Sequence, residues 1–225
     1  YDGKKIDYAQ KIVGFLQEKI SEGKFDTKII DFQELQTKGF NREFTDFFMK
    51  NYDDDERQHP LEGIDAIMTD RAGVCIGVST ADCIPVLLYD SVHHVVCAIH
   101  AGWRGTVSRI VEQSIKAMTD TYGTNPIDVV AQIGPGISLD SFEVGDEVYE
   151  AFAQAGFPME QISRREAKWH IDLPACNRLQ LLAMGVKPER ISVSDICTYK
   201  AHDTFFSARR LGINSGRIFT AMMLK

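Results

Sequence analysis

Four short apolar runs follow one another in the middle of the chain and restrict its possible folds more than any other feature. Only a few turn residues separate each run from the next. Such short connections favour strands that lie next to one another and are partly antiparallel. The predicted strands are Ile64–Thr69, Val74–Thr80, Ile84–Asp90 and Val95–His100.

Helices are predicted where apolar residues recur at helical spacing, most clearly over residues 106–121. That segment places one apolar stripe on its surface, made of Val107, Ile110, Val111, Ile115 and Met118. The other predicted helices are 6–22, Val144–Ala155 and a segment from Pro174 to about Met184. The other predicted strands are Thr27–Phe32, Asp128–Ile133, Trp169–Leu173, Ile191–Ser194, Thr204–Ser207 and Arg217–Met222. Residues 36–62 are polar and poorly periodic, which predicts a surface loop.

The mixture of adjacent strands and packed helices predicts an α+β fold, with mixed β-sheets packed against outer layers of helices. The chain has 225 residues, shows no internal repeat and has no break in composition that would indicate a linker. This length suits one large domain. We therefore expect a single domain over residues 1–225.

Composition excludes several classes of partner. The formal net charge is −7 and no basic cluster is longer than a pair, so electrostatic binding to nucleic acid or to acidic membranes is not expected. No stretch approaches the roughly 20 apolar residues that a membrane-spanning helix needs. The five cysteines form no CxxC motif, which is typical of free thiols in a reducing compartment. The expected location is the cytoplasm.

A cysteine and a histidine stand at the ends of two neighbouring predicted strands. Cys83 directly precedes one strand, and His100 closes the next. A thiol and an imidazole in this arrangement can bind a soft metal ion, or act as nucleophile and base. Asp82 could orient the imidazole or a ligand, and the glycines at 102 and 105 let the backbone approach a bound molecule closely. The plain alternative is a buried cysteine beside a core histidine.

The turn after His100 leads directly into the predicted helix over residues 106–121. Unpaired backbone N–H groups and the dipole at a helix start favour an anion there. Arg104 adds a bidentate donor suited to phosphate or carboxylate. The alternative is an ordinary strand-to-helix turn with a surface arginine. Trp103 could be a platform for substrate or have a packing role. Charge alone favours solvated side chains for Arg209 and Arg210.

The remaining histidines and cysteines carry simpler expectations. His93 and His94 are predicted to lie in a hairpin turn. Cys75 and Cys97 are expected in the core because they sit inside apolar runs, and Cys176 is expected in a helix.

Taken together, these motifs resemble the laccase-domain family, whose members are also called multicopper polyphenol oxidoreductases, purine nucleoside phosphorylases and peptidoglycan-editing factors. The matching residues run from about Pro60 to the C-terminus. They comprise Leu61–Ala66, Ser79–Leu87, Ala98–Thr106, Gly134–Ile137, Cys197–Thr198 and Phe206–Gly212, with Gly216 and Arg217.

The resemblance implies an α+β fold with a metal ion, usually zinc and possibly copper, held by one cysteine and two histidines. Cys83 and His100 match two of these ligands. The third falls in the segment Gln36–Gly39, where Lys38 stands in the place of the histidine. A protonated lysine has no lone pair to donate, so His59, which also lies upstream of Cys83, is the possible substitute. The glycine-rich segment at the N-terminus of the family is missing before Tyr1.

The resemblance also implies an enzyme with transferase and hydrolase activities: phosphorolysis of adenosine, inosine, guanosine or methylthioadenosine, and deamination of adenosine. The catalytic residues would be Cys83, His100 and Asp82. Substrate and phosphate would bind at Arg104, Gly102, Gly105, Arg209 and Arg210. The partners are then small purine nucleosides and phosphate, and we expect a monomer or a small homo-oligomer.

Two other functions remain open. The first is a cysteine hydrolase of the peptidoglycan-precursor editing type, with Cys83 as nucleophile, His100 as base and Asp82 as the orienting group. The second is a metal-depleted, non-enzymatic relative that acts through a partner, which Lys38 and the missing segment would support. Polyphenol oxidation is disfavoured because one Cys-His-His site falls short of the ligand set of a multicopper oxidase.

Overall fold

The computed structural model describes residues 65–212 and 214–225. They belong to one compact unit, which begins at Gly63 and ends at Lys225. The predicted helix over 6–22, the strand Thr27–Phe32 and the loop over 36–62 lie outside the described residues. The single domain predicted for 1–225 includes those residues too, and it stays a prediction.

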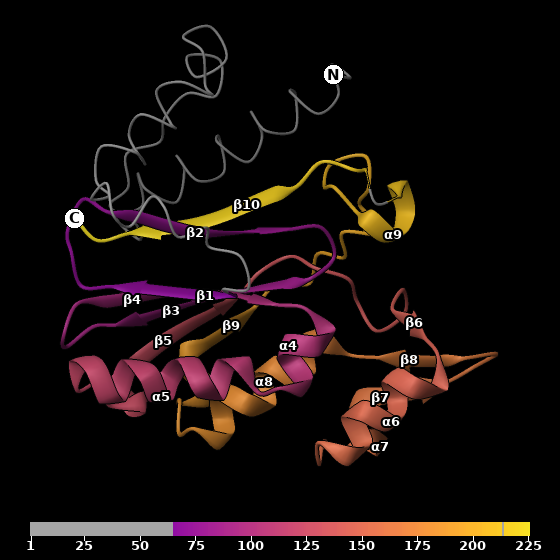
Figure 1. The fold of residues 1–225 in the computed structure, drawn as a ribbon, viewed down its shortest axis with the longest axis horizontal. Coiled ribbons are helices and arrows are strands. Elements are labelled where there is room, and N and C mark those ends of the chain that lie inside the picture. The colour runs from indigo at the N-terminus through magenta and orange to yellow at the C-terminus, as the bar shows by residue number, and fades with distance from the viewer. Residues whose placement is uncertain (1–64, 213) are drawn as a thin grey trace, which may run out of the picture. The chain divides into compact units, whose positions relative to one another are not determined.

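A five-stranded sheet forms the centre of the unit, with strand order β1-β4-β3-β5-β9 (Figure 1). Its first three pairings are antiparallel, and β5 with β9 is parallel. The sheet is therefore mixed, as the sequence predicts. Its strands are β1 (Ala66–Thr69), β3 (Ile84–Asp90), β4 (Val95–Ala101), β5 (Val129–Ile133) and β9 (Ile191–Val193).

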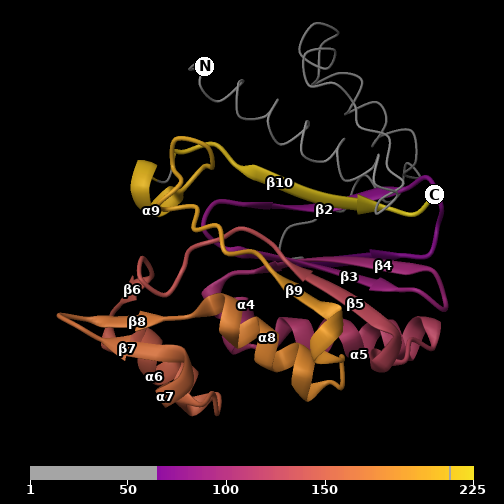
Figure 2. The ribbon, with the colours of Figure 1, turned by 180° about the vertical axis from the view of Figure 1, so that it is seen from behind.

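Two smaller sheets accompany the central one. The antiparallel pair β2 (Cys75–Thr80) and β10 (Ile218–Met223) lies over one face of it (Figures 1 and 2). Between these layers lies a small apolar cluster that includes Ile76 of β2 and Val96 and Ala98 of β4. A three-stranded sheet is formed by β6 (Glu143–Val144), β8 (Trp169–Ile171) and β7 (Ser163–Arg165).

Helices cover the other face of the central sheet, so the predicted α+β architecture is confirmed (Figure 2). These are α4 (Trp103–Val107), α5 (Ile110–Tyr122) and α8 (Leu173–Ala183). The remaining helices are α6 (Asp146–Gln154), α7 (Met159–Ile162) and α9 (Ala208–Leu211), with single 3₁₀ turns at Pro126–Asp128 and Pro188–Arg190. None of the helices among the described residues has the length and apolar character that crossing a membrane requires.

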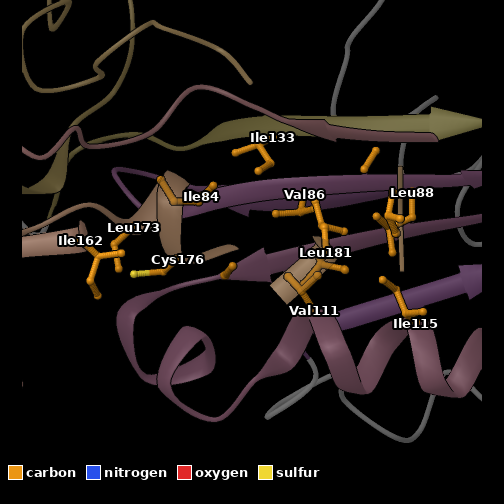
Figure 3. Packing of buried hydrophobic residues seen from close by; sticks show 14 of the residues in the cluster. Ile84, Val86, Leu88, Val111, Ile115, Ile133, Ile162, Leu173, Cys176 and Leu181 are labelled. Carbon is orange, nitrogen blue, oxygen red and sulfur yellow. The ribbon is translucent and has the colours of Figure 1, made fainter. Parts of the chain in front are cut away.

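The main core lies between β3 and the helices α5 and α8 (Figure 3). Alternate residues of β3 point toward the helices, and Ile84, Val86 and Leu88 are fully buried there. The intervening Leu87 and Tyr89 pack against the β2–β10 layer. Because both faces of β3 are covered, its sequence is a continuous apolar run rather than an alternating one.

The prediction of one continuous helix over residues 106–121 is wrong, because the helix is interrupted between α4 and α5. Arg109 at the break has a left-handed backbone, with φ of 61°. The buried Gln180 of α8 fixes the break: its amide nitrogen donates to the Thr106 carbonyl at 3.2 Å, and its oxygen accepts from the Val111 N–H at 3.2 Å. Arg109 itself donates to the Ala155 carbonyl at 2.6 Å. Tertiary contacts thus override the local helical pattern.

The predicted strand Thr204–Ser207 is also wrong. Thr204 and Phe205 donate their N–H groups to the Ala201 carbonyl and form a turn. Ser207 then begins α9, because its hydroxyl accepts from the N–H of Arg210 at 3.1 Å. The sequence did not predict α7, α9, β6 and β7, each of which is four residues or shorter.

Candidate functional site

Cys83 and His100 meet at the open end of the β3–β4 hairpin. The strand register pairs Pro85 with His100 and Ile84 with Ala101, which brings the residue before β3 close to the end of β4. A Cβ atom added to Gly102 would lie 3.2 Å from Cys83 Sγ and 3.9 Å from His100 Nε2. The thiol and the outer imidazole nitrogen therefore face the same small space, and Gly102 leaves that space open.

Asp65 orients the imidazole of His100 from the other side. Its carboxylate lies 2.8 Å from His100 Nδ1, and its carbonyl accepts from the His100 backbone N–H at 2.7 Å. The β1–β4 register, in which Ala66 pairs with Ile99, brings Asp65 opposite His100. This residue was missed at the sequence level. Asp65 belongs to the predicted strand Ile64–Thr69, but the residue that it faces depends on a register that the sequence does not reveal.

The environment of His100 favours its protonated form. The hydrogen bond with Cys83 is the largest influence and raises the pKa of His100, burial lowers it, and Asp65 raises it further, to about 9. Cysteine, histidine and aspartate thus form one line of hydrogen-bonded groups. Such a line can hold a proton on the imidazole, or release it when a metal ion binds.

The donors fit part of a zinc site. A cysteine sulfur and an imidazole nitrogen are ligands that zinc prefers, and a carboxylate on the opposite nitrogen is the usual partner of a metal-bound histidine. Within 65–212 and 214–225, no three histidine, cysteine, aspartate or glutamate side chains are grouped so that they could hold a metal ion. Lys38, which stands in the place of the third ligand, and His59, the possible substitute, lie outside the described residues.

The carboxylate of Asp82 bonds to Thr198 and to the Arg209 N–H, so the expectation that it orients the imidazole of His100 is wrong. One carboxylate oxygen accepts from the Thr198 hydroxyl at 2.7 Å. The other accepts from the backbone N–H of Arg209 at 2.7 Å. Asp82 is 8% exposed and has a left-handed backbone with φ of 84°. It therefore ties the loop of Cys83 to two segments near the C-terminus.

The helix that directly follows His100 is short. α4 has five residues and ends before the left-handed Arg109, so the long α5 does not begin at the site as expected. Arg104 is exposed, and its guanidinium lies 4.3 Å from the centre of the Trp103 ring. At Gly105 an added Cβ would lie 3.5 Å from Ile110, an ordinary contact. The argument for close backbone approach therefore holds for Gly102 and not for Gly105.

Arg209 and Arg210 present exposed guanidinium groups from α9. The Arg209 guanidinium donates to the Glu143 carbonyl at 2.7 Å, and the Arg210 guanidinium donates to the Tyr199 hydroxyl at 3.2 Å. Arg209 also lies 5.5 Å from the centre of the Phe142 ring, and Arg210 lies 5.2 Å from the centre of the Tyr199 ring. A guanidinium has five N–H donors, so these contacts leave capacity for a bound anion.

Most of the remaining histidines and cysteines serve the fold. His93 and His94 lie in the β3–β4 turn, as predicted. Cys97 is buried and Cys176 lies in α8, both as predicted, whereas Cys75, also predicted in the core, is only partly buried. His170 is 7% exposed, and its Nδ1 lies 3.0 Å from the Leu139 carbonyl oxygen.

A cavity of about 300 Å³ lies beside the carboxyl ends of β5 and β9 and the start of α8. Neither Cys83 nor His100 lines it. Its lining consists of Gly136, Ser138, Leu139, Asp140, Asp172, Pro174, Val193, Ser194, Asp195 and Ile196. The reactive groups of the hairpin are therefore separate from this cavity.

Comparisons with known proteins identify the family of the chain. Residues 41–225 match the model of a family described as multi-copper polyphenol oxidoreductase laccase. A purine nucleoside phosphorylase of Bacteroides thetaiotaomicron is 55% identical over 172 residues, which cover 75% of this chain and 64% of the relative. Adenosine deaminase RL5, from an unknown prokaryotic organism, is 48% identical over 176 residues, which cover 77% of this chain and 67% of the relative.

Solved structures show the same fold. The crystal structure of YlmD from Geobacillus stearothermophilus superposes with a TM-score of 0.69 at 32% identity, covering 72% of this chain and 62% of YlmD. The chain therefore spans just under two thirds of the length of the Bacteroides relative and of YlmD.

Proposed function

The chain belongs to the family of multi-copper polyphenol oxidoreductase laccases, and from this premise we propose that it is a zinc-dependent purine nucleoside phosphorylase that also deaminates adenosine. The observation that carries the proposal is the meeting of the Cys83 thiol and the His100 imidazole, with Asp65 behind the imidazole. The names of the relatives, purine nucleoside phosphorylase and adenosine deaminase, support the same reaction classes. The expected substrates are adenosine, inosine, guanosine and methylthioadenosine.

Each residue of the site has a role in this proposal. Cys83 Sγ and His100 Nε2 would hold the zinc ion, together with a third ligand from outside the described residues. When bound, zinc would supply Lewis-acid activation of phosphate or water. Asp65 keeps the imidazole oriented, so that Nε2 faces the thiol. The exposed Arg104 is one of the arginines, with Arg209 and Arg210, that are available for the phosphate that attacks the anomeric carbon of the ribose and displaces the purine base.

Metal content and phosphate dependence test this function together. We expect about one zinc ion per purified chain and release of free hypoxanthine from inosine only when phosphate is present. Removal of zinc by a chelator should stop the reaction, and added zinc should restore it. Equal turnover in the metal-free protein would contradict the zinc-dependent mechanism.

A cysteine hydrolase is the second candidate, and one observation favours it. Cys83, His100 and Asp65 lie in the order nucleophile, base and orienting carboxylate. Asp65 thereby takes the orienting role that was expected of Asp82. A thiol alkylating reagent should then inactivate the metal-free protein, and zinc should inhibit rather than restore activity. The opposite response to zinc supports the phosphorylase.

The setting of the reaction is part of the proposal. All five cysteines are free thiols, which suits a reducing compartment such as the cytoplasm. We expect a monomer or a small homo-oligomer, which light scattering after gel filtration would measure. A protein with no bound metal and no turnover of any purine nucleoside would instead be a non-enzymatic relative.

A further inference from the structure

Segments from distant parts of the sequence meet at Asp82. Its two carboxylate oxygens accept from Thr198 and from the Arg209 N–H, which are 116 and 127 positions away. Its carbonyl accepts from the Ile137 N–H at 2.8 Å. A left-handed backbone at a residue other than glycine is uncommon, and here it lets one buried residue bind all three segments. Asp82 thus fixes the residue next to it, Cys83, relative to the C-terminal part of the chain.

Thr198 is held as firmly as Asp82. It is fully buried, and its N–H donates to the Gly136 carbonyl at 3.0 Å while its hydroxyl donates to Asp82. Gly136 in turn has little space for a side chain, because an added Cβ would meet Ile84 Cδ1 and would lie 3.0 Å from the Asp82 carbonyl oxygen. The Thr198 hydroxyl is therefore a fixed donor that orients the carboxylate of Asp82.

The oriented carboxylate of Asp82 secures the start of α9. This helix has only four residues, so its own hydrogen bonds are too few to hold it. The Arg209 N–H bonds to Asp82, and the Arg210 N–H bonds to Ser207. These two contacts fix the backbone from which the consecutive side chains of Arg209 and Arg210 extend, beside the loop of Cys83.

We propose that Thr198 and Asp82 are positioning residues that hold Arg209 and Arg210 so that their guanidinium groups bind the phosphate co-substrate. The proposal rests on the phosphorylase function proposed above. Phosphate matches the planar fork of a guanidinium, and two fixed forks bind it better than two mobile ones. Thr198 and Asp82 act through the two arginines and do not touch the substrate.

The matched pair Thr198→Val and Thr198→Ser tests this role. Valine keeps the shape of threonine but removes the donor to Asp82, whereas serine keeps the donor. We expect Thr198→Val to raise the KM for phosphate by about tenfold, the usual scale for losing a hydrogen bond to a charged group, and to change kcat little. Thr198→Ser should restore the KM. An unchanged KM in Thr198→Val would overturn the proposal.

A stability control separates positioning from general loss of structure. Ser114→Ala removes another buried hydroxyl, which donates to the Ile110 carbonyl at 2.7 Å within α5. This variant should lower the unfolding temperature and leave the KM for phosphate unchanged. A rise in KM equal to that of Thr198→Val would overturn the proposal, because it would reflect destabilisation alone.

Two further measurements on the full chain need no turnover, so they keep this inference distinct from the proposed function. Hydrogen exchange of the Arg209 amide should be faster in Thr198→Val and normal in Thr198→Ser. The dissociation constant for inorganic phosphate, measured by calorimetry, should rise by about tenfold in Thr198→Val. If both results are obtained with a protein that cleaves no nucleoside, the phosphorylase function is refuted and the positioning role is supported. Unchanged exchange and unchanged phosphate binding would refute the positioning role even in an active enzyme.

Discussion

The two ends of the β3–β4 hairpin each carry a histidine bonded to an aspartate. At the turn, His93 Nδ1 lies 2.9 Å from a carboxylate oxygen of Asp90. At the open end, His100 Nδ1 lies 2.8 Å from a carboxylate oxygen of Asp65. Distance and chemistry are nearly the same in the two pairs, so the surroundings decide what each pair can do.

The two aspartates differ in burial and in the number of hydrogen bonds that their carboxylates accept. The side chain of Asp90 is fully buried and also accepts from the backbone N–H groups of Val92 and His93. Burial raises its pKa, but Thr124 and these hydrogen bonds lower it to about 2. The side chain of Asp65 is 52% exposed. At the turn, structural hydrogen bonds therefore occupy the buried carboxylate of Asp90, although the His93 side chain is 40% exposed.

The histidines differ in what their second nitrogen faces. Nε2 of His100 faces the thiol of Cys83 and the space beside Gly102. Nε2 of His93 faces the backbone at Gly123, where an added Cβ would lie 3.8 Å away. Of the two pairs, only His100–Asp65 has a second reactive group and free space beside the Nε2 of its histidine, so only this pair is placed to take part in chemistry.

Exchange of each histidine for alanine gives the largest expected contrast. His100→Ala removes a predicted metal ligand and should abolish phosphorolysis of inosine together with zinc binding. His93→Ala should leave both unchanged and lower the free energy of unfolding, because the buried carboxylate of Asp90 loses a hydrogen-bond partner. Inosine turnover and elemental analysis of the two variants check this. An active, zinc-containing His100→Ala variant would contradict the zinc site.

Removal of the charge on Asp65 should have the next largest effect. Asp65→Asn keeps the size of the side chain but weakens the orientation of His100. We expect a loss of about 10- to 100-fold in zinc affinity or in kcat/KM, the usual cost of losing such a partner. The free energy of unfolding should fall by less than about 1 kcal/mol, since the side chain is half exposed. A kcat/KM equal to that of the wild type would show that Asp65 does not orient the imidazole.

Asp90→Asn should affect stability and not activity. The folded-state pKa near 2 lies below the unfolded value of 3.8, so the ionised carboxylate stabilises the fold above about pH 4. This contribution, about 2 kcal/mol, is lost as the pH falls through 2. Urea unfolding should therefore show a difference between wild type and variant at pH 7 that disappears near pH 2. A difference that does not depend on pH would contradict the low pKa.

His94→Asn should have the smallest effect. The ring Nδ1 lies 3.1 Å from the Tyr89 hydroxyl at an exposed position, and asparagine tolerates the left-handed backbone at this position, where φ is 53°. We expect the free energy of unfolding to change by less than about 0.5 kcal/mol. A larger loss would mean that the turn depends on this contact as well as on Asp90.

The strands of the hairpin could be predicted because local pattern and burial agree there. The predicted strand Ile84–Asp90 matches β3 residue for residue, and Val95–His100 differs from β4 by one residue. Continuous apolar runs with short connections have few alternatives to adjacent buried strands. The single helix predicted over 106–121 failed because the amide of Gln180, far away in sequence, binds the backbone where α4 ends and α5 begins.

The site itself could be predicted only in part. The pairing of Cys83 and His100 follows from their positions at the same end of two adjacent strands. The partner of His100 could not be predicted, because a shift of one residue between β1 and β4 would remove Asp65 from it. Asp82 looked like the orienting carboxylate from sequence proximity, but its oxygens are taken by Thr198 and Arg209.

The sequence alone therefore determined the fold class, the main strands and the cysteine–histidine pair, since short-range apolar patterns and short connections specify these. The tertiary structure decided which aspartate serves the imidazole, where the long helix breaks and what Asp82 holds. Those features depend on strand register and on hydrogen bonds between residues far apart in the chain. Each such bond is available to several polar side chains until packing brings one of them into place.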